Sequence, residues 1–210
     1  MFKNCTKLTA MPSLPATTLE EECYEWMFEG CTELTQVTLL PATILKKLCY
    51  NAMFYNCSKL VDASSIFDNN VSYTLDESCC QNMFYGCTSL TEAPPLPATY
   101  LASKCYQSMF KGCSSLTTSP ILPAATLKSQ CYEEMFRNCS SLTTITCLST
   151  TSITSGNSQS YTKNWVDGVP AGGSNVGVFR TSQSMSKYSW GGYNSQDGIP
   201  QGWTVTPYTP

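Results

Sequence analysis

Residues 83–108 read MFYGCTSLTEAPPLPATYLASKCYQS, and residues 109–134 repeat the same pattern as MFKGCSSLTTSPILPAATLKSQCYEE. The Met-Phe pair that opens both stretches occurs six times, at steps of 26, 26, 30, 26 and 26 residues. The pairs begin at Met1, Met27, Met53, Met83, Met109 and Met135. A period of about 20–50 residues is the signature of a solenoid or another repeat array, and leucine-rich repeats fall within it. The sequence therefore predicts one stacked array over residues 1–148.

Two leucine columns mark an extended part of each repeat. Leu90 and Leu116 belong to the first column, and Leu96 and Leu122 belong to the second. The stretch between the columns is rich in Thr and Pro, which suits a short extended or polyproline-like segment better than a helix. The proline that usually follows the second leucine limits further strand pairing.

A short helix is predicted after each extended segment. Leu101, Cys105, Met109 and Cys113 are four residues apart and share one slowly drifting helical face. Only Gly or Asn precedes the cysteine that ends this pattern, and these two residues best tolerate the left-handed conformation of a helix C-cap. They are Asn4, Gly30, Asn56, Gly86, Gly112 and Asn138. Each repeat is thus predicted as extended segment, turn, helix and left-handed stop, and it buries its apolar face by stacking on its neighbours.

Eleven of the 13 cysteines recur in two columns, and most of the cysteines are predicted to be reduced, buried and packed as small apolar residues. Cysteines eight residues apart on one helix are separated by about 12 Å, too far for a disulfide. Side chains in a parallel ladder also point the same way, which disfavours bridges between repeats. Zinc is not expected, because there is no Cys-x-x-Cys and no histidine.

The motif Met-Phe-x-(Gly/Asn)-Cys-x-x-Leu, followed by Leu-Pro and then Cys-Tyr, resembles the BspA-like leucine-rich repeats of anaerobic gut and oral bacteria. Met stands here where that family commonly has Ala. The resemblance implies an α/β repeat solenoid, a leucine-rich-repeat array with short extended segments on one face and short helices on the other. It also implies a protein at the cell surface or outside the cell, with a role in adhesion. The chain opens inside the repeat, so the lack of a secretory segment at residue 1 says little about the native protein.

Composition excludes several classes of function. The 12 Lys and Arg are outnumbered by 15 Asp and Glu, whereas nucleic-acid binding needs clustered cations, so no nucleic-acid partner is expected. The absence of histidine removes every Ser-His, Cys-His and His-metal arrangement. No apolar run reaches the length of about 18 residues that a membrane span needs. No cofactor and no catalytic residue is predicted.

The third repeat carries four extra residues, in the stretch Ile66–Tyr73. Insertions in repeat arrays map to loops, often on the binding face. Asp68, Asn69 and Asn70 favour a plain turn, because the glycine and distal glutamate of a calcium loop are absent. Phe67, Val71 and Tyr73 either fold back onto the array or form an exposed patch for a partner.

Residues 149–210 change composition and are predicted to form a Ser/Thr-rich connection followed by a small β-rich C-terminal cap. Strands are expected at 176–181 and 202–206. Trp165 and Phe179 suit the capping role. The alternative is a sugar-binding platform built from the aromatic residues of the tail, which are Trp165, Phe179, Tyr188, Trp190, Tyr193, Trp203 and Tyr208.

Positions that vary between repeats are the candidates for ligand contact. They are Gln36, Asp62, Glu92 and Thr118 on the extended segments, with Phe67, Asp68, Asn69 and Tyr73 in the insertion. Asp62 and Glu92 lie on neighbouring repeats of a flat stack, whereas glycosidase chemistry needs a pocket around such a pair, so no enzyme is expected. The leading hypothesis is a surface or secreted protein that binds a protein or glycan of a host or neighbouring cell. The alternatives are a carbohydrate-binding module and a structural spacer or phage-encoded display module without a ligand.

Overall fold

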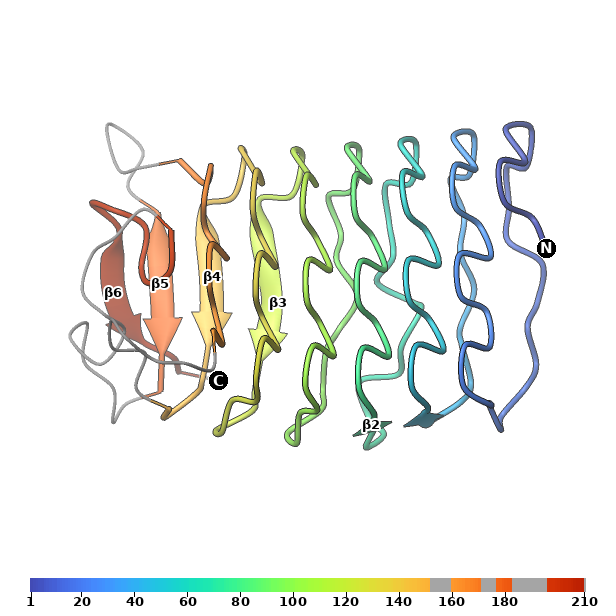
Figure 1. The fold of residues 1–210 in the computed structure, drawn as a ribbon. Coiled ribbons are helices and arrows are strands. Elements are labelled where there is room, and N and C mark those ends of the chain that lie inside the picture. Colours follow the sequence, from blue (N-terminus) through green and yellow to red (C-terminus); the bar gives the residue numbers. More distant parts are fainter. Residues whose placement is uncertain (152–159, 171–176, 183–195, 210) are drawn as a thin grey trace.

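The computed structural model describes residues 1–151, 160–170, 177–182 and 196–209. The chain winds into a row of stacked coils that runs from the N-terminus to strand β6 (Figure 1). Each coil has an extended segment on one side and a run of tight turns on the other. We call these two sides of the solenoid the extended face and the turn face. The repeat solenoid predicted from the 26-residue period is confirmed.

The extended segments pair in parallel from coil to coil. Strands β3 (Thr118–Leu122), β4 (Thr144–Cys147), β5 (Val178–Thr181) and β6 (Thr204–Pro207) form a four-stranded sheet in that order. Nearer the N-terminus the pairing is reduced to single bridges, Ala10 with Gln36 and Asp62 with Glu92. Strands β1 (Ile44–Leu45) and β2 (Thr74–Leu75) pair where the chain passes to the turn face. Stacked parallel strands bury the inward side chain of every coil against the next.

The prediction of short helices is wrong: no helix occurs in the described residues. The segments expected to be helical are chains of β-turns, here called turn segments. They cover residues 20–31, 46–57, 76–87, 102–113 and 128–139.

Hydrogen bonding explains why a turn segment replaces a helix. In segment 46–57 alternate N–H groups close local turns, as when Tyr55 donates to the carbonyl of Ala52 at 3.1 Å. The intervening N–H groups donate to the next coil, as when Phe54 bonds the carbonyl of Met83 at 2.9 Å. A helix would bond every N–H within its own segment and leave nothing to join the coils. The turn ladder satisfies the backbone and links neighbouring coils at the same time.

The predicted left-handed position is confirmed, although it ends a turn segment and not a helix. All six Gly or Asn residues before the cysteine have φ between 58° and 78°. The choice between the two residues follows a rule along the stack. The side-chain oxygen of Asn56 occupies the space in which a Cβ on Gly86 would lie, and Asn4 and Asn138 do the same to Gly30 and Gly168. An asparagine at this position therefore requires glycine in the following coil.

Gly86 and Gly112 offer a matched test of this rule. Gly86→Ala should cost more stability than Gly112→Ala, because both strain a positive φ but only the first meets an asparagine oxygen. In the background Asn56→Gly the two substitutions should cost the same. Urea denaturation of the four variants measures both differences. Equal costs in the parent protein would contradict the steric rule.

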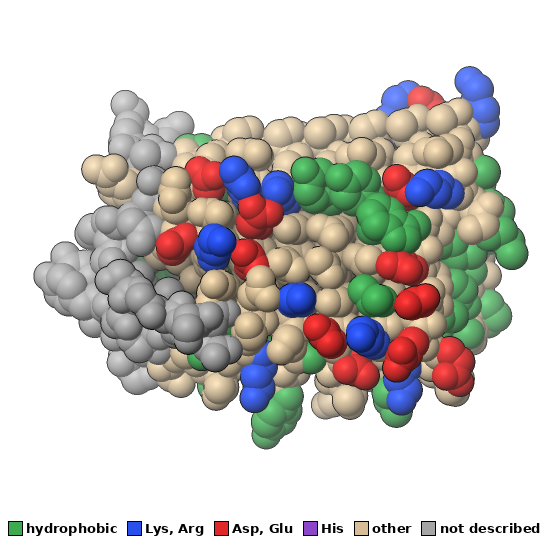
Figure 2. Space-filling model, viewed as in Figure 1, with side chains coloured by type: hydrophobic (Ala, Val, Ile, Leu, Met, Phe, Trp, Pro, Cys, Tyr) green, Lys and Arg blue, Asp and Glu red, His purple; other side chains and the backbone are tan. Residues whose placement is uncertain are grey.

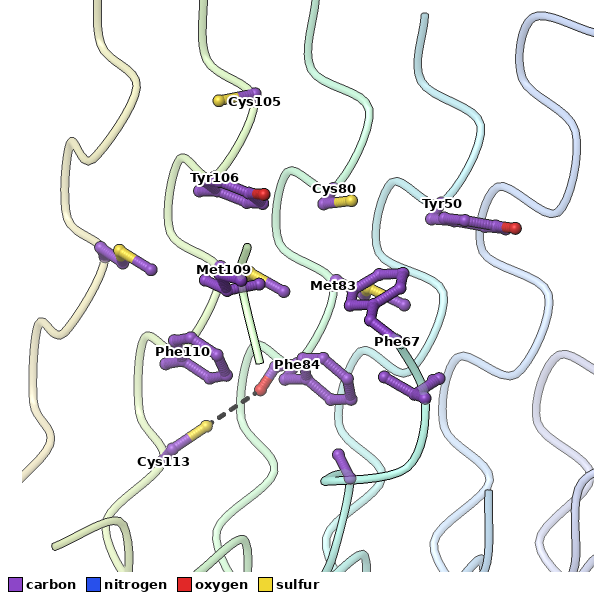
Figure 3. Packing of buried hydrophobic residues seen from close by; sticks show 14 of the residues in the cluster. Tyr50, Phe67, Cys80, Met83, Phe84, Cys105, Tyr106, Met109, Phe110 and Cys113 are labelled. Atoms are coloured by element: carbon purple, nitrogen blue, oxygen red, sulfur yellow. Dashed lines mark hydrogen bonds between the residues drawn. The ribbon is translucent and has the colours of Figure 1, made fainter. Parts of the chain in front are cut away.

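The core is a set of side-chain ladders that run along the solenoid. The phenylalanine of each Met-Phe pair stacks on the next, with ring centroids 5.4–5.9 Å apart from Phe2 to Phe136. The cysteine three residues later donates its thiol hydrogen to the carbonyl oxygen of the phenylalanine one coil back (Figure 3). For Cys113 and Phe84 the Sγ–O distance is 3.1 Å, and the other four pairs lie at 3.0–3.2 Å. These cysteines thus act as hydrogen-bond donors as well as apolar filling.

The insertion fills a gap in the tyrosine ladder. Tyr24 stacks on Tyr50 at 6.1 Å and Tyr106 on Tyr132 at 6.3 Å, but the coil between them carries the smaller Cys80. Phe67 from the insertion packs instead on Tyr50, with centroids 6.4 Å apart, and edge-on to Tyr73 at 5.5 Å. Phe67 is 5% exposed and Tyr73 is 9% exposed. Of the two outcomes expected for the insertion, the structure shows the fold-back onto the array.

Replacing both residues should reveal this compensation. Phe67→Ala should cost about 3–5 kcal/mol through the cavity that it leaves. Cys80→Tyr should cost about 1–3 kcal/mol, because the space is already filled. The double variant should be more stable than the sum of the two effects, by about 0.5–3 kcal/mol in a double-mutant cycle. Additive effects would mean that the insertion does not substitute for the missing ring.

The tail continues the ladder across the predicted boundary at residues 148 and 149. The backbone N–H of Phe136 donates to the carbonyl of Trp165 at 2.8 Å, and the backbone N–H of Asn138 donates to the carbonyl of Asp167 at 2.7 Å. Residues 160–169 therefore form a further turn segment, with Gly168 in the left-handed position at φ 77°. Strands β5 and β6 confirm the two strands expected in the tail. Trp165 and Phe179 are buried and pack edge-on at 6.1 Å.

Candidate binding surface

A row of exposed side chains crosses the extended face, one from each coil. The residues that vary between repeats fall into register here, since Ala10 bridges to Gln36, Asp62 to Glu92 and Thr118 to Thr144. All are exposed except Thr144, which is half-buried. We call these six residues the variable row. Gln36, Asp62, Glu92 and Thr118 thus lie on one surface, as the repeat alignment predicts.

The side chains of the variable row are largely unpaired. The Asp62 carboxylate accepts the N–H of Ser64 at 2.7 Å. No hydrogen bond or ion pair holds the side chains of Gln36, Glu92 and Thr118 within the described part of the chain. These groups are free to contact another molecule.

The four candidates in the insertion separate into two kinds. Phe67 and Tyr73 are in the core, so they cannot meet a ligand from solvent. Asp68 is half-buried and Asn69 is exposed. Asp68 accepts the N–H of Asn70 through its carboxylate at 2.8 Å, and its own N–H donates to the hydroxyl of Tyr73 at 2.9 Å. This is the plain turn expected for the stretch, anchored to the core through Tyr73.

A groove of about 560 Å³ lies beside the variable row, over three successive coils. Half of its ten described lining residues are prolines: Pro94, Pro95, Pro97, Pro120 and Pro123. Ile121, which is 44% exposed, contributes an aliphatic wall, and Ser64 and Asn69 lie at the opposite side. The groove was not predicted from the sequence. The available sign in the sequence was a proline at the same position of two adjacent repeats, Pro94 and Pro120.

The turn face carries an aromatic patch flanked by charged side chains (Figure 2). Tyr55 and Tyr85 stack with centroids 4.4 Å apart, and Trp26 tilts against Tyr55 at 5.6 Å. Lys3 lies over the Trp26 ring and Lys111 over the Tyr85 ring, at 5.3 and 5.4 Å. The three rings therefore pack on one another and on lysine side chains, while each stays partly exposed.

Polar side chains of the turn face pair with each other from coil to coil. Asn51 donates to the Glu25 carboxylate at 2.7 Å, and Gln107 donates to Glu133 at 2.7 Å. Lys111 forms an ion pair with Glu134 at 2.7 Å. The hydrogen bonds from Lys111 and Arg137 outweigh partial burial and lower the pKa of the Glu134 carboxyl. The turn face thus uses its polar groups to join coils, in contrast to the variable row.

Three of the tail aromatics considered for a sugar platform are buried, and Tyr208 is half-buried. Trp165, Phe179 and Trp203 are at most 2% exposed. The indole N–H groups of Trp165 and Trp203 donate to the carbonyls of Gly198 and Pro170. Tyr188, Trp190 and Tyr193 lie outside the described residues.

The cysteines form no reactive centre on this surface. All 13 are free thiols, and all except Cys5 and Cys23 are buried. Burial raises the pKa of the Cys87, Cys139 and Cys147 thiols to about 12. At neutral pH such groups stay protonated and carry little nucleophilic thiolate.

Taken together, these features define a class of protein: a leucine-rich solenoid with a rigid laddered core and an exposed, variable face. A sequence model of the BspA type leucine-rich repeat region matches the chain in six copies, over residues 1–83 and 76–164. The chain belongs to this family. Leucine-rich repeats of this type point to a role in protein interaction or adhesion, and the family is generally surface-associated or secreted.

Neither a curated protein nor a solved structure shows a significant match to this chain. In the described residues, no helix has the length and apolar character needed to cross a membrane.

Proposed function

We propose that this chain is a non-enzymatic binding protein, displayed at a cell surface or secreted, that presents its extended face to a protein of a host or a neighbouring cell. The observation that carries the proposal is the contrast between repeated and varied positions. The repeated columns are buried, whereas the variable row is exposed, in register and largely unpaired. Varied side chains on a rigid scaffold are how repeat proteins build binding surfaces.

The chemistry of this face supports binding over catalysis. Asp62 and Glu92 lie on neighbouring coils of an exposed row, outside the lining of the groove. The chain has no histidine to serve as a base, and its buried thiols are not ionised near neutral pH. A surface without an activated nucleophile or an enclosed acid–base pair suits recognition.

A binding screen with two matched variants tests the proposal. The full chain is immobilised and probed with a panel of extracellular-matrix proteins and with a glycan array. Gln36→Lys with Thr118→Lys places two new charges on the extended face, and Glu20→Gln with Glu21→Gln makes the same net charge change on the turn face. We expect a matrix protein to bind and the first variant to lose about tenfold or more in affinity, while the second is unaffected.

Other outcomes of the screen would replace the proposal. Glycan binding alone would favour the carbohydrate-binding alternative. Binding that only the turn-face variant disrupts would move the site to the opposite face. Silence toward both sets of probes would favour a structural spacer.

A further inference from the structure

The groove on the extended face is built from rigid parts. Five of its lining residues are prolines, whose ring fixes one backbone dihedral and leaves few conformations to lose on binding. Asn69 at its edge belongs to the insertion, which is anchored by the buried Phe67 and by the bond from the Asp68 N–H to Tyr73. The groove is therefore a preformed feature of this repeat and its neighbours.

The groove lies where the sheet stops. Strand β3 is the edge of the four-stranded sheet, and the segment on its other side contains Pro94, Pro95 and Pro97. Proline has no N–H to donate, so regular ladder pairing cannot continue from β3 to this segment. The volume of about 560 Å³ falls within the range of about 300–1,000 Å³ typical of ligand pockets.

The groove has a largely apolar lining, and acidic side chains lie beside it. None of the described residues that line the groove carries a charged side chain. The segments that form it, residues 61–75, 91–103 and 117–127, contain Asp62, Asp68 and Glu92 but no lysine or arginine. Asp62 and Glu92 are exposed and lie two residues before Ser64 and Pro94 of the lining. The electrostatic potential beside the groove therefore favours a cation.

We infer that this groove docks a short segment of a partner protein that carries an aromatic or large aliphatic side chain next to lysine or arginine. The large side chain would fill the proline-lined volume, and the basic group would lie against Asp62 and Glu92. Aromatic and arginine side chains dominate the energy of many protein interfaces. The inference rests on the proposed function, because it requires that the extended face binds protein.

Selection of random peptides displayed on phage against the full chain tests this assignment. Ile121→Ser removes the aliphatic wall, and it is a mild change because Ser13 and Ser65 occupy the same column in other coils. Leu39→Ser is the matched control, since Leu39 shares that column, is similarly exposed at 47% and lies outside the groove. Asp62→Asn with Glu92→Gln removes the charge and keeps the shape.

We expect the selected peptides to share an aromatic or large aliphatic residue beside lysine or arginine. Synthetic copies should lose about tenfold in affinity for Ile121→Ser and keep it for Leu39→Ser. Selection against the charge variant should retain the apolar residue and lose the basic one. Circular dichroism and the urea midpoint confirm that each variant is folded.

Four results would overturn the inference. If the selected peptides share no motif, or if they bind the Ile121→Ser variant as tightly as the parent protein, the groove is not a peptide site. An acidic motif would rule out the electrostatic part. Glycan binding that Ile121→Ser abolishes would assign the groove to a sugar. A matrix protein that binds the extended face and tolerates both groove variants would leave the proposed function in place while rejecting this site.

Discussion

Raising the pH above about 9 should unfold this protein over a narrow range, because its core holds many protonated thiols. An unfolded thiol has a pKa near 8.5, whereas burial raises the pKa of Cys87, Cys131, Cys139 and Cys147 to about 12. Between these values the unfolded chain loses protons that the folded chain keeps, so stability is full below about pH 8.5 and falls as the pH rises toward 12. Each such thiol costs about 1.4 kcal/mol per pH unit in this window.

The summed effect is large on the scale of protein stability. Four thiols together cost about 5–6 kcal/mol per pH unit, and a typical domain is stable by about 5–15 kcal/mol. Burial also raises the pKa of Tyr106 and Tyr132, which adds to the effect in the same direction. Urea midpoints measured with a reducing agent at increasing pH should fall steeply from about pH 9 onward.

Serine substitution provides the control. Cys139→Ser keeps a hydrogen-bond donor for the Phe110 carbonyl and removes the titrating thiol. The pH dependence of its stability should be shallower by about 1.4 kcal/mol per pH unit. A urea midpoint that stays constant from pH 8 to about pH 10.5 would show that the thiols are not buried as described.

Phe110→Ala should be among the most destabilising single substitutions, at about 3–5 kcal/mol. Phe110 is fully buried and stacks on Phe84 at 5.8 Å and on Phe136 at 5.9 Å. Truncation leaves a cavity between two coils and removes both ring contacts. Urea denaturation at neutral pH measures the loss.

Two further variants separate the effect of lost side-chain volume from the effect of the position of the coil in the array. Phe110→Leu keeps most of the apolar volume and should cost clearly less than the alanine variant. Phe2→Ala should also cost less, because Phe2 is half-buried and has one ring neighbour in the ladder. If Phe110→Ala costs no more than Phe2→Ala, the internal coils do not gain stability from both neighbours as a repeat array should.

The repeat period and the apolar columns predicted the solenoid, its coils and its buried side chains. The helices were the error. Leu101, Cys105, Met109 and Cys113 are four apart, and a helix rotates such a set by about 40° at each step because it has 3.6 residues per turn. A ladder of β-turns repeats every four residues without drift. Strict fourfold spacing over twelve residues was therefore the available sign of turns.

Other left-handed residues in the turn segments had no sign in the sequence. Leu48, Ala52, Lys104 and Glu134 all have positive φ, although none of these residue types favours it. Hydrogen bonds from coil to coil impose the conformation, so it emerges only when the array stacks. This long-range cause explains why local propensity could not predict it.

The exposure of Gln36, Asp62, Glu92 and Thr118 could be predicted, because positions that vary between repeats are not fixed by the core. Their contact with a ligand stays a prediction. Phe67 and Tyr73 were misleading, since apolar residues in an insertion can equally fill a core. Their burial depends on Cys80, which lies 13 residues beyond Phe67 and stands where the other coils have a tyrosine. The missing tyrosine ring leaves the space that Phe67 fills.

The buried cysteines make the unfolding rate of this protein important. In an oxidising medium such as the cell exterior, the folded chain keeps eleven of its cysteines buried and away from oxidants in solution. One complete unfolding event would release all 13 together, and random pairing among them would block return to the stacked array. The working lifetime of such a protein outside the cell would then be set by its unfolding rate, not by its equilibrium stability. Contacts that form late in folding, and so slow unfolding, would matter most to its persistence.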